Sequence, residues 1–175
     1  GNRFPVGELD GSLSERATKL SETLVAAQLK SPVLDDIRSE IWLKLWGNMS
    51  FNPISALTHA TMVDICLEPA TRELVADMMR EAQVIGEKLG AVFRMPIEKR
   101  IAGAEKVGKH KTSTLQDVEA GRRVEIDALI GSVLELGELT GVATPAIRAV
   151  YALMKLLDRT MAEQRAAVVM LPMAA

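Results

Sequence analysis

The chain has 175 residues, enough for one domain with a substantial core or for two very small ones. Its formal net charge of −2 gives no electrostatic case for nucleic acid or an anionic membrane, and no apolar run approaches the ~20 residues that span a bilayer. The single cysteine excludes an internal disulfide and fits a reducing compartment, so we expect a cytoplasmic protein that binds neither nucleic acid nor membrane.

The first eleven residues, 1–11, are rich in turn-forming types and too short to form a unit. They are typical of the end of a preceding domain or of a linker, which leaves 12–175 as the body of the protein. That body opens with Ser12 and, three residues later, Glu15. This capping-box spacing predicts a first helix that ends near Gln28.

The next predicted helix, from about Val33, contains the least polar helical stretch of the chain and yet carries a regular line of polar residues. Lys44, Asn48 and Asn52 follow one another in steps of four, and a helix turns by about 100° per residue. We therefore expect the three side chains on one face of a helix that is otherwise made of Ile, Trp, Leu, Met and Phe.

Pro53 directly follows this polar line. Because proline lacks an N–H donor and disfavours α conformation in the residue before it, the sequence predicts a kink or break there, with helix resuming to about Cys66. A kink would free a backbone carbonyl at the end of the polar line, which is one way to build a binding site.

Five further helices are predicted from the apolar period and from proline or capping residues at their starts. They begin at Pro69, at Pro96, at Ser113, near Val124 and at Pro145. Together the elements predict an all-α domain of about seven helices packed around the second one.

The polar line has two interpretations. In a binding site, an amine polarises a carbonyl oxygen or donates a proton, while two amides donate and accept hydrogen bonds with a polar substrate. In a purely structural role, Lys44 extends to solvent, and Asn48 and Asn52 cap loops or neighbouring helices. Spacing alone favours the structural role.

Glu125 and Ser113 also have simple structural explanations, as a first-turn acid favoured by the helix dipole and as an N-cap. Their functional alternatives are a carboxylate partner for a substrate hydroxyl or for Lys44, and a hydroxyl that helps to bind a carboxylate. His59 and His110 stand in no ligand-spaced motif, so we expect no metal site, and no glycine-rich phosphate loop follows a strand.

The middle of the chain is basic. Without interleaved aromatic residues it is predicted to be a solvated surface, although it could help to attract an anionic substrate or a phosphorylated cofactor. The basic residues are Lys99, Arg100, Lys106, Lys109, Lys111, Arg122 and Arg123.

Several separate segments resemble one family, the ketopantoate reductases (2-dehydropantoate 2-reductases). The run 41–58 resembles the catalytic helix of that family, and the run 111–127 resembles its second signature. Gly131 followed by 141–145 is similar to its closing pattern, and 7–11 ahead of 14–16 is similar to its junction between domains. The resemblance covers essentially the whole chain.

This resemblance implies a two-domain enzyme in which an N-terminal Rossmann domain holds NADP(H) and a helical C-terminal domain contacts the substrate. The chain resembles only the second, a multi-helix domain of the 6-phosphogluconate dehydrogenase C-terminal-domain-like type. Residues 1–11 would be the tail of the cofactor domain, and no residue of this chain is predicted to bind the cofactor.

The resemblance also assigns roles to the candidate residues. Lys44 would be the catalytic lysine, hydrogen-bonded to the ketone oxygen and serving as general acid. Asn48, Asn52 and Ser113 would bind the substrate, and Glu125 would contact its hydroxyl and assist catalysis. Thr114 departs from the larger apolar residue that the family often has, which could alter the shape of the pocket.

The resulting hypothesis is an NADP-dependent 2-dehydropantoate 2-reductase, which reduces ketopantoate to pantoate in pantothenate biosynthesis. Its partners would be a small 2-oxo acid and the Rossmann domain of the same polypeptide, and a homodimer is left open. This chain alone would be inactive. The alternatives are a reductase of another 2-oxo acid on the same scaffold and a non-catalytic helical interaction domain.

Overall fold

The computed structural model describes residues 2–171 and separates the chain into two compact units, Gly1–Lys44 and Leu45–Ala175. The division falls inside one helix, α2, which runs continuously over Ile37–Thr58. The predicted boundary between 1–11 and 12–175 stays a prediction.

The first unit contains α1 (Glu15–Ala26) and short extended segments. Ser14, not Ser12, is the N-cap of α1, because its hydroxyl accepts a hydrogen bond from the amide of Ala17 at 3.1 Å. The predicted cap was therefore two residues too early. Ser12 instead donates its amide to the carboxylate of Asp10 at 3.0 Å.

The start of α2 was also predicted too early, near Val33. Val33 forms a parallel bridge with Val6, and Leu34 donates its amide to the carbonyl of Val6 at 2.8 Å. These contacts hold the chain extended, so helix begins only at Ile37.

Of the kink or break predicted at Pro53, the break is wrong, since α2 continues through the proline to Thr58, and the kink stays a prediction. Every residue from 51 to 56 is buried, and this packing outweighs the one backbone hydrogen bond that proline removes. The helix ends instead before His59, whose φ of 57° is left-handed, and α3 (Met62–Leu67) follows as a separate helix.

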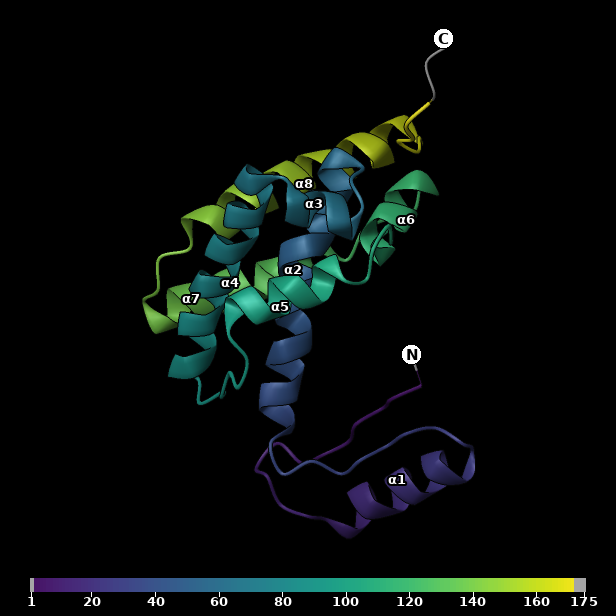
Figure 1. The fold of residues 1–175 in the computed structure, drawn as a ribbon, viewed down its shortest axis with the longest axis vertical. Coiled ribbons are helices and arrows are strands. Elements are labelled where there is room, and N and C mark those ends of the chain that lie inside the picture. Colours follow the sequence, from purple (N-terminus) through teal and green to yellow (C-terminus); the bar gives the residue numbers. More distant parts are fainter. Residues whose placement is uncertain (1, 172–175) are drawn as a thin grey trace. The chain divides into compact units, whose positions relative to one another are not determined.

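The remaining elements all lie in the second unit and confirm the predicted all-α class (Figure 1). They are α4 (Pro69–Lys88), α5 (Ile97–Glu105), α6 (Ser113–Glu119), a π-helical turn η1 (Asp127–Gly131), α7 (Ser132–Thr140) and α8 (Pro145–Gln164). Within residues 2–171 the only β-type pairing consists of isolated bridges, and no helix there is both long and apolar enough to cross a bilayer.

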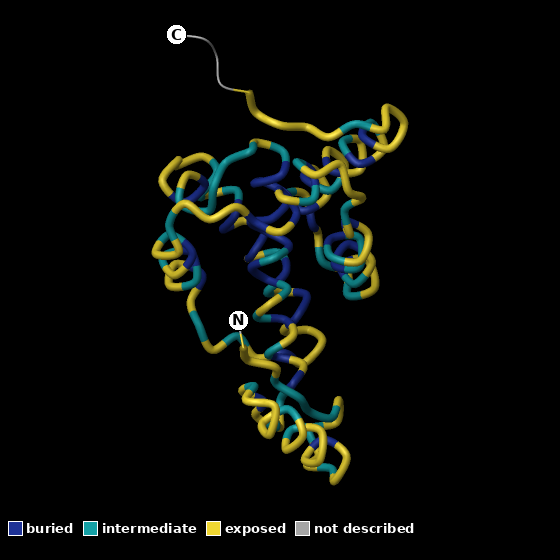
Figure 2. The backbone as a smooth tube through the Cα atoms, turned by 90° about the vertical axis from the view of Figure 1, so that its right-hand side faces the viewer, coloured by how far each residue is buried: buried dark blue, intermediate teal, exposed yellow. Residues whose placement is uncertain are grey.

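Two buried helical segments form the core of the second unit. Helix α4 packs against α3, α5, α7 and α8, and its Met78 and Met79 are fully buried. The part of α2 after Lys44 runs among the other helices as a buried segment (Figure 2). Trp46 joins the two, because its indole N–H donates to the carbonyl oxygen of Met79 at 2.7 Å.

The N-terminus of α8 is capped by a side chain of another helix. Thr144, the residue before the helix, makes no side-chain capping bond. The carboxylate of Glu81 on α4 instead accepts from the amides of Ala146 at 2.8 Å and Ile147 at 3.0 Å. This acid satisfies two free amides at the positive end of the helix dipole and fixes α8 against α4.

Candidate active site

The three polar residues of α2 occupy successive turns of one continuous helix, as their spacing predicted. They differ in exposure. Lys44 is exposed, Asn48 is half-buried and Asn52 is buried, with 8% of its surface accessible. A buried amide needs hydrogen-bond partners, so Asn52 is the residue of the three whose surroundings matter most.

Asn52 meets Ser113, which is 61 positions away in sequence. The amide nitrogen of Asn52 donates to the hydroxyl of Ser113 at 3.5 Å, the upper end of hydrogen-bond length. The predicted N-cap role of Ser113 is wrong, because Thr112 caps α6 by accepting from the amide of Leu115 at 3.2 Å. The Ser113 hydroxyl is therefore available to a second polar group.

A small hollow brings Asn48 and Asn52 together with Glu125. It leaves a cavity volume of about 10 Å³, room for about one water molecule. Its lining residues are Asn48, Asn52, Pro53, Thr114, Glu125, Ile126, Leu129 and Ile130. Two amides and a carboxylate thus stand beside an aliphatic wall, an arrangement that suits a small ligand with polar groups at one side.

The sequence predicts that Glu125 lies in the first turn of a helix, and this prediction is wrong. Glu125 precedes the π-helical turn η1, where Asp127 is the first-turn acid, and its carbonyl accepts from the amide of Leu129 at 3.1 Å. The Glu125 residue is exposed. π-Helical turns occur frequently at functional sites, because the wider turn changes the direction of nearby side chains.

Arg100 of α5 is one of the basic residues predicted to be solvated, but it is half-buried and lies beside Gly47 of α2. A Cβ atom added to Gly47 would lie 2.1 Å from Nη2 of Arg100, so a larger residue at this position of α2 would force the guanidinium of Arg100 to move. Burial lowers the pKa of the Arg100 guanidinium. Among the described residues none forms an ion pair with Arg100. Gly47, inside a buried helix, was the available signal.

The predicted basic surface is in part neutralised by acidic neighbours. Lys111 pairs with Glu119 at 2.8 Å and Arg122 pairs with Asp117 at 2.7 Å. These lie on the exposed part of the surface, where ion pairs contribute little to stability.

A model of the family described as ketopantoate reductase PanE/ApbA C terminal matches residues 36–158. A 2-dehydropantoate 2-reductase from Mesorhizobium japonicum is 57% identical over 155 residues, which cover 89% of this chain and 48% of that protein. Another from Archaeoglobus fulgidus is 30% identical over 78% of this chain and 46% of that protein. The chain thus spans about half the length of these curated relatives.

Solved structures agree with this match. The structure of a 2-dehydropantoate 2-reductase from Methylococcus capsulatus is 31% identical, has a TM-score of 0.84, and covers 91% of this chain and 55% of that one. A ternary structure of D-mandelate dehydrogenase with NADH and anilino(oxo)acetate has a TM-score of 0.82 over 91% of this chain and 68% of that one. At 22% identity it shows a common fold.

Proposed function

Since the chain belongs to the ketopantoate reductase family, whose C-terminal domain it matches, we propose that it forms the substrate side of an NADP-dependent 2-dehydropantoate 2-reductase. The observation that carries this proposal is the convergence of Asn48, Asn52, Ser113 and Glu125. These residues come from three separate segments, and each has hydrogen-bonding capacity suited to a hydroxylated 2-oxo acid.

The amides and the hydroxyl would hold the substrate. Asn52 already donates to Ser113, so an entering carboxylate or hydroxyl oxygen could accept from both side chains by replacing this long contact. Asn48 borders the same hollow from the preceding turn of α2. Glu125, as a carboxylate, would accept a hydrogen bond from the substrate hydroxyl.

Lys44 would act on the ketone. It stands one turn before Asn48 on α2, and an ammonium group at that position would donate a hydrogen bond to the ketone oxygen. Stabilising the negative charge that develops on this oxygen, and then transferring a proton to it, completes the reduction to an alcohol. The general-acid role fits an exposed side chain that only a bound substrate and a second domain would cover.

The described residues do not fit a dinucleotide site, because they contain no strand followed by a glycine-rich turn and a helix N-terminus. We therefore assign NADPH to a Rossmann domain of the intact polypeptide, where it would supply the hydride. The hollow has room for only about one water molecule, so a 2-oxo acid bound there would need a second domain to enclose it. This supports the assignment of NADPH to a separate domain. A homodimer stays a prediction that light scattering would test.

The substrate is tested by steady-state kinetics of the intact enzyme with NADPH and a panel of 2-oxo acids. We expect ketopantoate to give the highest kcat/KM. If another 2-oxo acid gives the highest kcat/KM, the enzyme is a reductase of that acid on the same scaffold. If none of them is reduced, the result favours a non-catalytic interaction domain.

The substrate-binding role is tested by Asn52→Ala, which should mainly raise KM, because it removes binding without removing the proton donor. Kinetics equal to wild type would make Asn52 purely structural. The chain of 175 residues alone should show no turnover, and measurable reduction by it would contradict the assignment of NADPH to another domain.

A further inference from the structure

Glu125 lies in an exposed connection between α6 and η1, yet the residues on both sides of it are fixed to the same helix. Before it, Arg123 and Val124 bind the carboxylate of Asp158. After it, Asp127 binds Tyr151 and Lys155. All three partners belong to α8, so one helix holds the short segment at two points.

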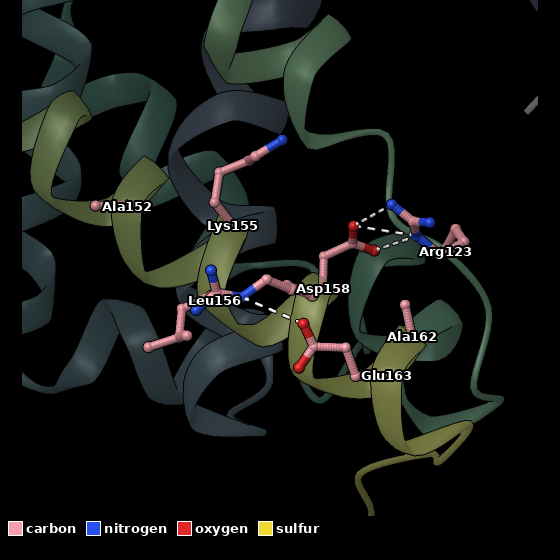
Figure 3. Close-up of a pocket in the computed structure, with 8 residues that line it drawn as sticks. Arg123, Ala152, Lys155, Leu156, Asp158, Ala162 and Glu163 are labelled. Atoms are coloured by element: carbon pink, nitrogen blue, oxygen red, sulfur yellow. Dashed lines mark hydrogen bonds and ion pairs between the residues drawn. The ribbon is translucent and has the colours of Figure 1, made fainter.

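The first attachment is to a buried acid. Arg123 donates to Asp158 from Nε at 2.9 Å and from Nη2 at 2.7 Å, and the amide of Val124 donates to Oδ1 at 3.2 Å. The side chain of Asp158 is only 7% exposed, whereas that of Arg123 is 74% exposed. Figure 3 shows the fork of the guanidinium directed at the carboxylate of α8. Paired bonds of this kind fix orientation as well as distance.

The second attachment lies two residues after Glu125. The phenol of Tyr151 donates to Oδ1 of Asp127 at 2.6 Å, and the ammonium of Lys155 donates to Oδ2 at 2.8 Å. These contacts, led by the bond from Lys155, lower the pKa of the Asp127 carboxyl. Asp127 begins η1, and η1 packs on α8, so this attachment fixes the start of the π-helical turn.

The three α8 residues are spaced for this task. Tyr151, Lys155 and Asp158 follow at steps of four and three, which places them on one face of a helix. We call this set the α8 clamp. The segment that it holds includes the carbonyl of Glu125, which accepts from Leu129 of η1, so the backbone of Glu125 is fixed from both directions.

A hollow of about 500 Å³ lies beside the clamp, and the cations that line it resemble those of an anion site. Each of them already has an acidic partner among the described residues: Arg123 with Asp158, Lys155 with Asp127 and Arg159 with Glu163. The lining charges are thus explained without a ligand.

We infer that the α8 clamp positions Glu125 for catalysis, so that Tyr151, Lys155 and Asp158 act on the reaction through Glu125 and not by touching the substrate. The inference rests on the proposed role of Glu125. An exposed acid on an irregular segment would otherwise sample many orientations, and a displacement of about 1 Å in a reacting group lowers rates by about 10²-fold.

The kinetic test uses the intact enzyme with ketopantoate and NADPH. Asp127→Ala is suitable because the Asp127 side chain is 65% exposed and its removal leaves no cavity. We expect kcat to fall by about 10- to 100-fold with KM changed by less than about threefold. Asp158→Asn should act in the same direction. Glu163→Gln, which breaks another ion pair of α8, is the matched control and should leave kcat unchanged.

Double variants show whether the clamp acts through Glu125. If it does, Asp127→Ala should lower kcat in the wild-type background but hardly change it when Glu125→Gln is already present. Equal losses in both backgrounds would overturn the inference. A wild-type kcat for Glu125→Gln would instead remove Glu125 from the proposed function, which is a different result.

A second measurement is independent of activity. In the 175-residue chain, amide hydrogen exchange of Val124 and Leu129 reports on the bonds to Asp158 and to the Glu125 carbonyl. We expect faster exchange of Val124 in Asp158→Asn and of Leu129 in Asp127→Ala, and wild-type exchange at both in Glu163→Gln. Unchanged exchange in both Asp158→Asn and Asp127→Ala would overturn the positioning of this segment.

Discussion

The two sides of the candidate site are held by different interactions. On one side, Asn52 lies on α2, and other residues of this helix, including Trp46 and Phe51, are almost completely buried. On the other side, Glu125 lies on an exposed segment that two ionic attachments fix to α8. Apolar packing positions the amides, whereas charged hydrogen bonds fix the segment that carries the carboxylate.

This difference means that the two sides should respond to different perturbations. Loss of buried volume should affect the α2 side and the stability of the whole unit, because cores are closely packed. Acid should affect mainly the Glu125 side, because its attachments depend on ionised carboxylates. The expected effects on stability fall from a buried aromatic residue of α2, through the α8 clamp, to an exposed ion pair.

Phe51→Ala should destabilise the protein by about 3–5 kcal/mol, because it removes a fully buried aromatic side chain and leaves a cavity. Urea unfolding followed by circular dichroism measures the change. Leu153→Ala on α8, where the side chain is exposed, is the control and should cost less than about 0.5 kcal/mol. If Phe51→Ala lowered the free energy of unfolding by as little as the control does, the claim that Phe51 is packed in a core would be contradicted.

Gly47→Ala should destabilise by about 1 kcal/mol, because the new methyl group displaces the half-buried guanidinium of Arg100. The matched control is Gly103→Ala in α5, where a Cβ atom meets nothing within 4 Å. That change should stabilise by about 0.5–1 kcal/mol, since alanine favours helix. If Gly47→Ala raised the melting temperature, as Gly103→Ala should, the close approach of Arg100 to Gly47 would be refuted.

Acid should weaken the α8 clamp. Hydrogen bonds from Arg123 lower the pKa of Asp158 below its ordinary value of 3.8, and those from Lys155 and then Tyr151 lower that of Asp127. Because folding lowers these pKa values, the stabilisation is complete above the unfolded pKa and is lost as pH falls through the folded one.

The measurement is stability against pH from about 6 to 2, in the range where carboxyl groups titrate. Wild type should lose more stability than Asp127→Asn over this interval, because the variant lacks one of the two linked carboxyls. Parallel curves would show that Asp127 is not ion-paired in solution.

The smallest effect is expected for Arg148→Gln. Arg148 pairs with Glu138 at 3.1 Å, and both side chains are more than half exposed. Such pairs contribute about 0–1 kcal/mol and are screened by salt. A loss in kcat comparable to that of Asp127→Ala would show that any ion pair of α8 affects the enzyme, which would remove the special role of the clamp.

Local signals in the sequence predicted most helix starts after α3. Pro69, Ser113 and Pro145 each begin a helix, as predicted. The helix does not break at Pro53 because the tendency of proline to interrupt a helix is a local preference, whereas the burial of 51–56 is a tertiary effect that outweighs it. Val33 likewise pairs with a distant residue that no local rule considers.

The site was less accessible to local reasoning. Spacing could place Lys44, Asn48 and Asn52 on one helix, but only the family resemblance connected them with Ser113 and Glu125. The capping of α8 by Glu81 and the attachment of Arg123 to Asp158 join residues 65 and 35 positions apart. Neither has a periodic signature, and the π-helical turn after Glu125 has none either.

The central claim, that this chain carries the proton donor of a 2-oxo acid reductase, is tested most directly by the kcat of Lys44→Ala in the intact enzyme with ketopantoate and NADPH. Lys19→Ala, which changes an exposed lysine of α1, is the control. We predict a fall of about 10²–10⁴-fold for Lys44→Ala, the typical contribution of a general acid, with no change in the control. A kcat near that of wild type would contradict the account.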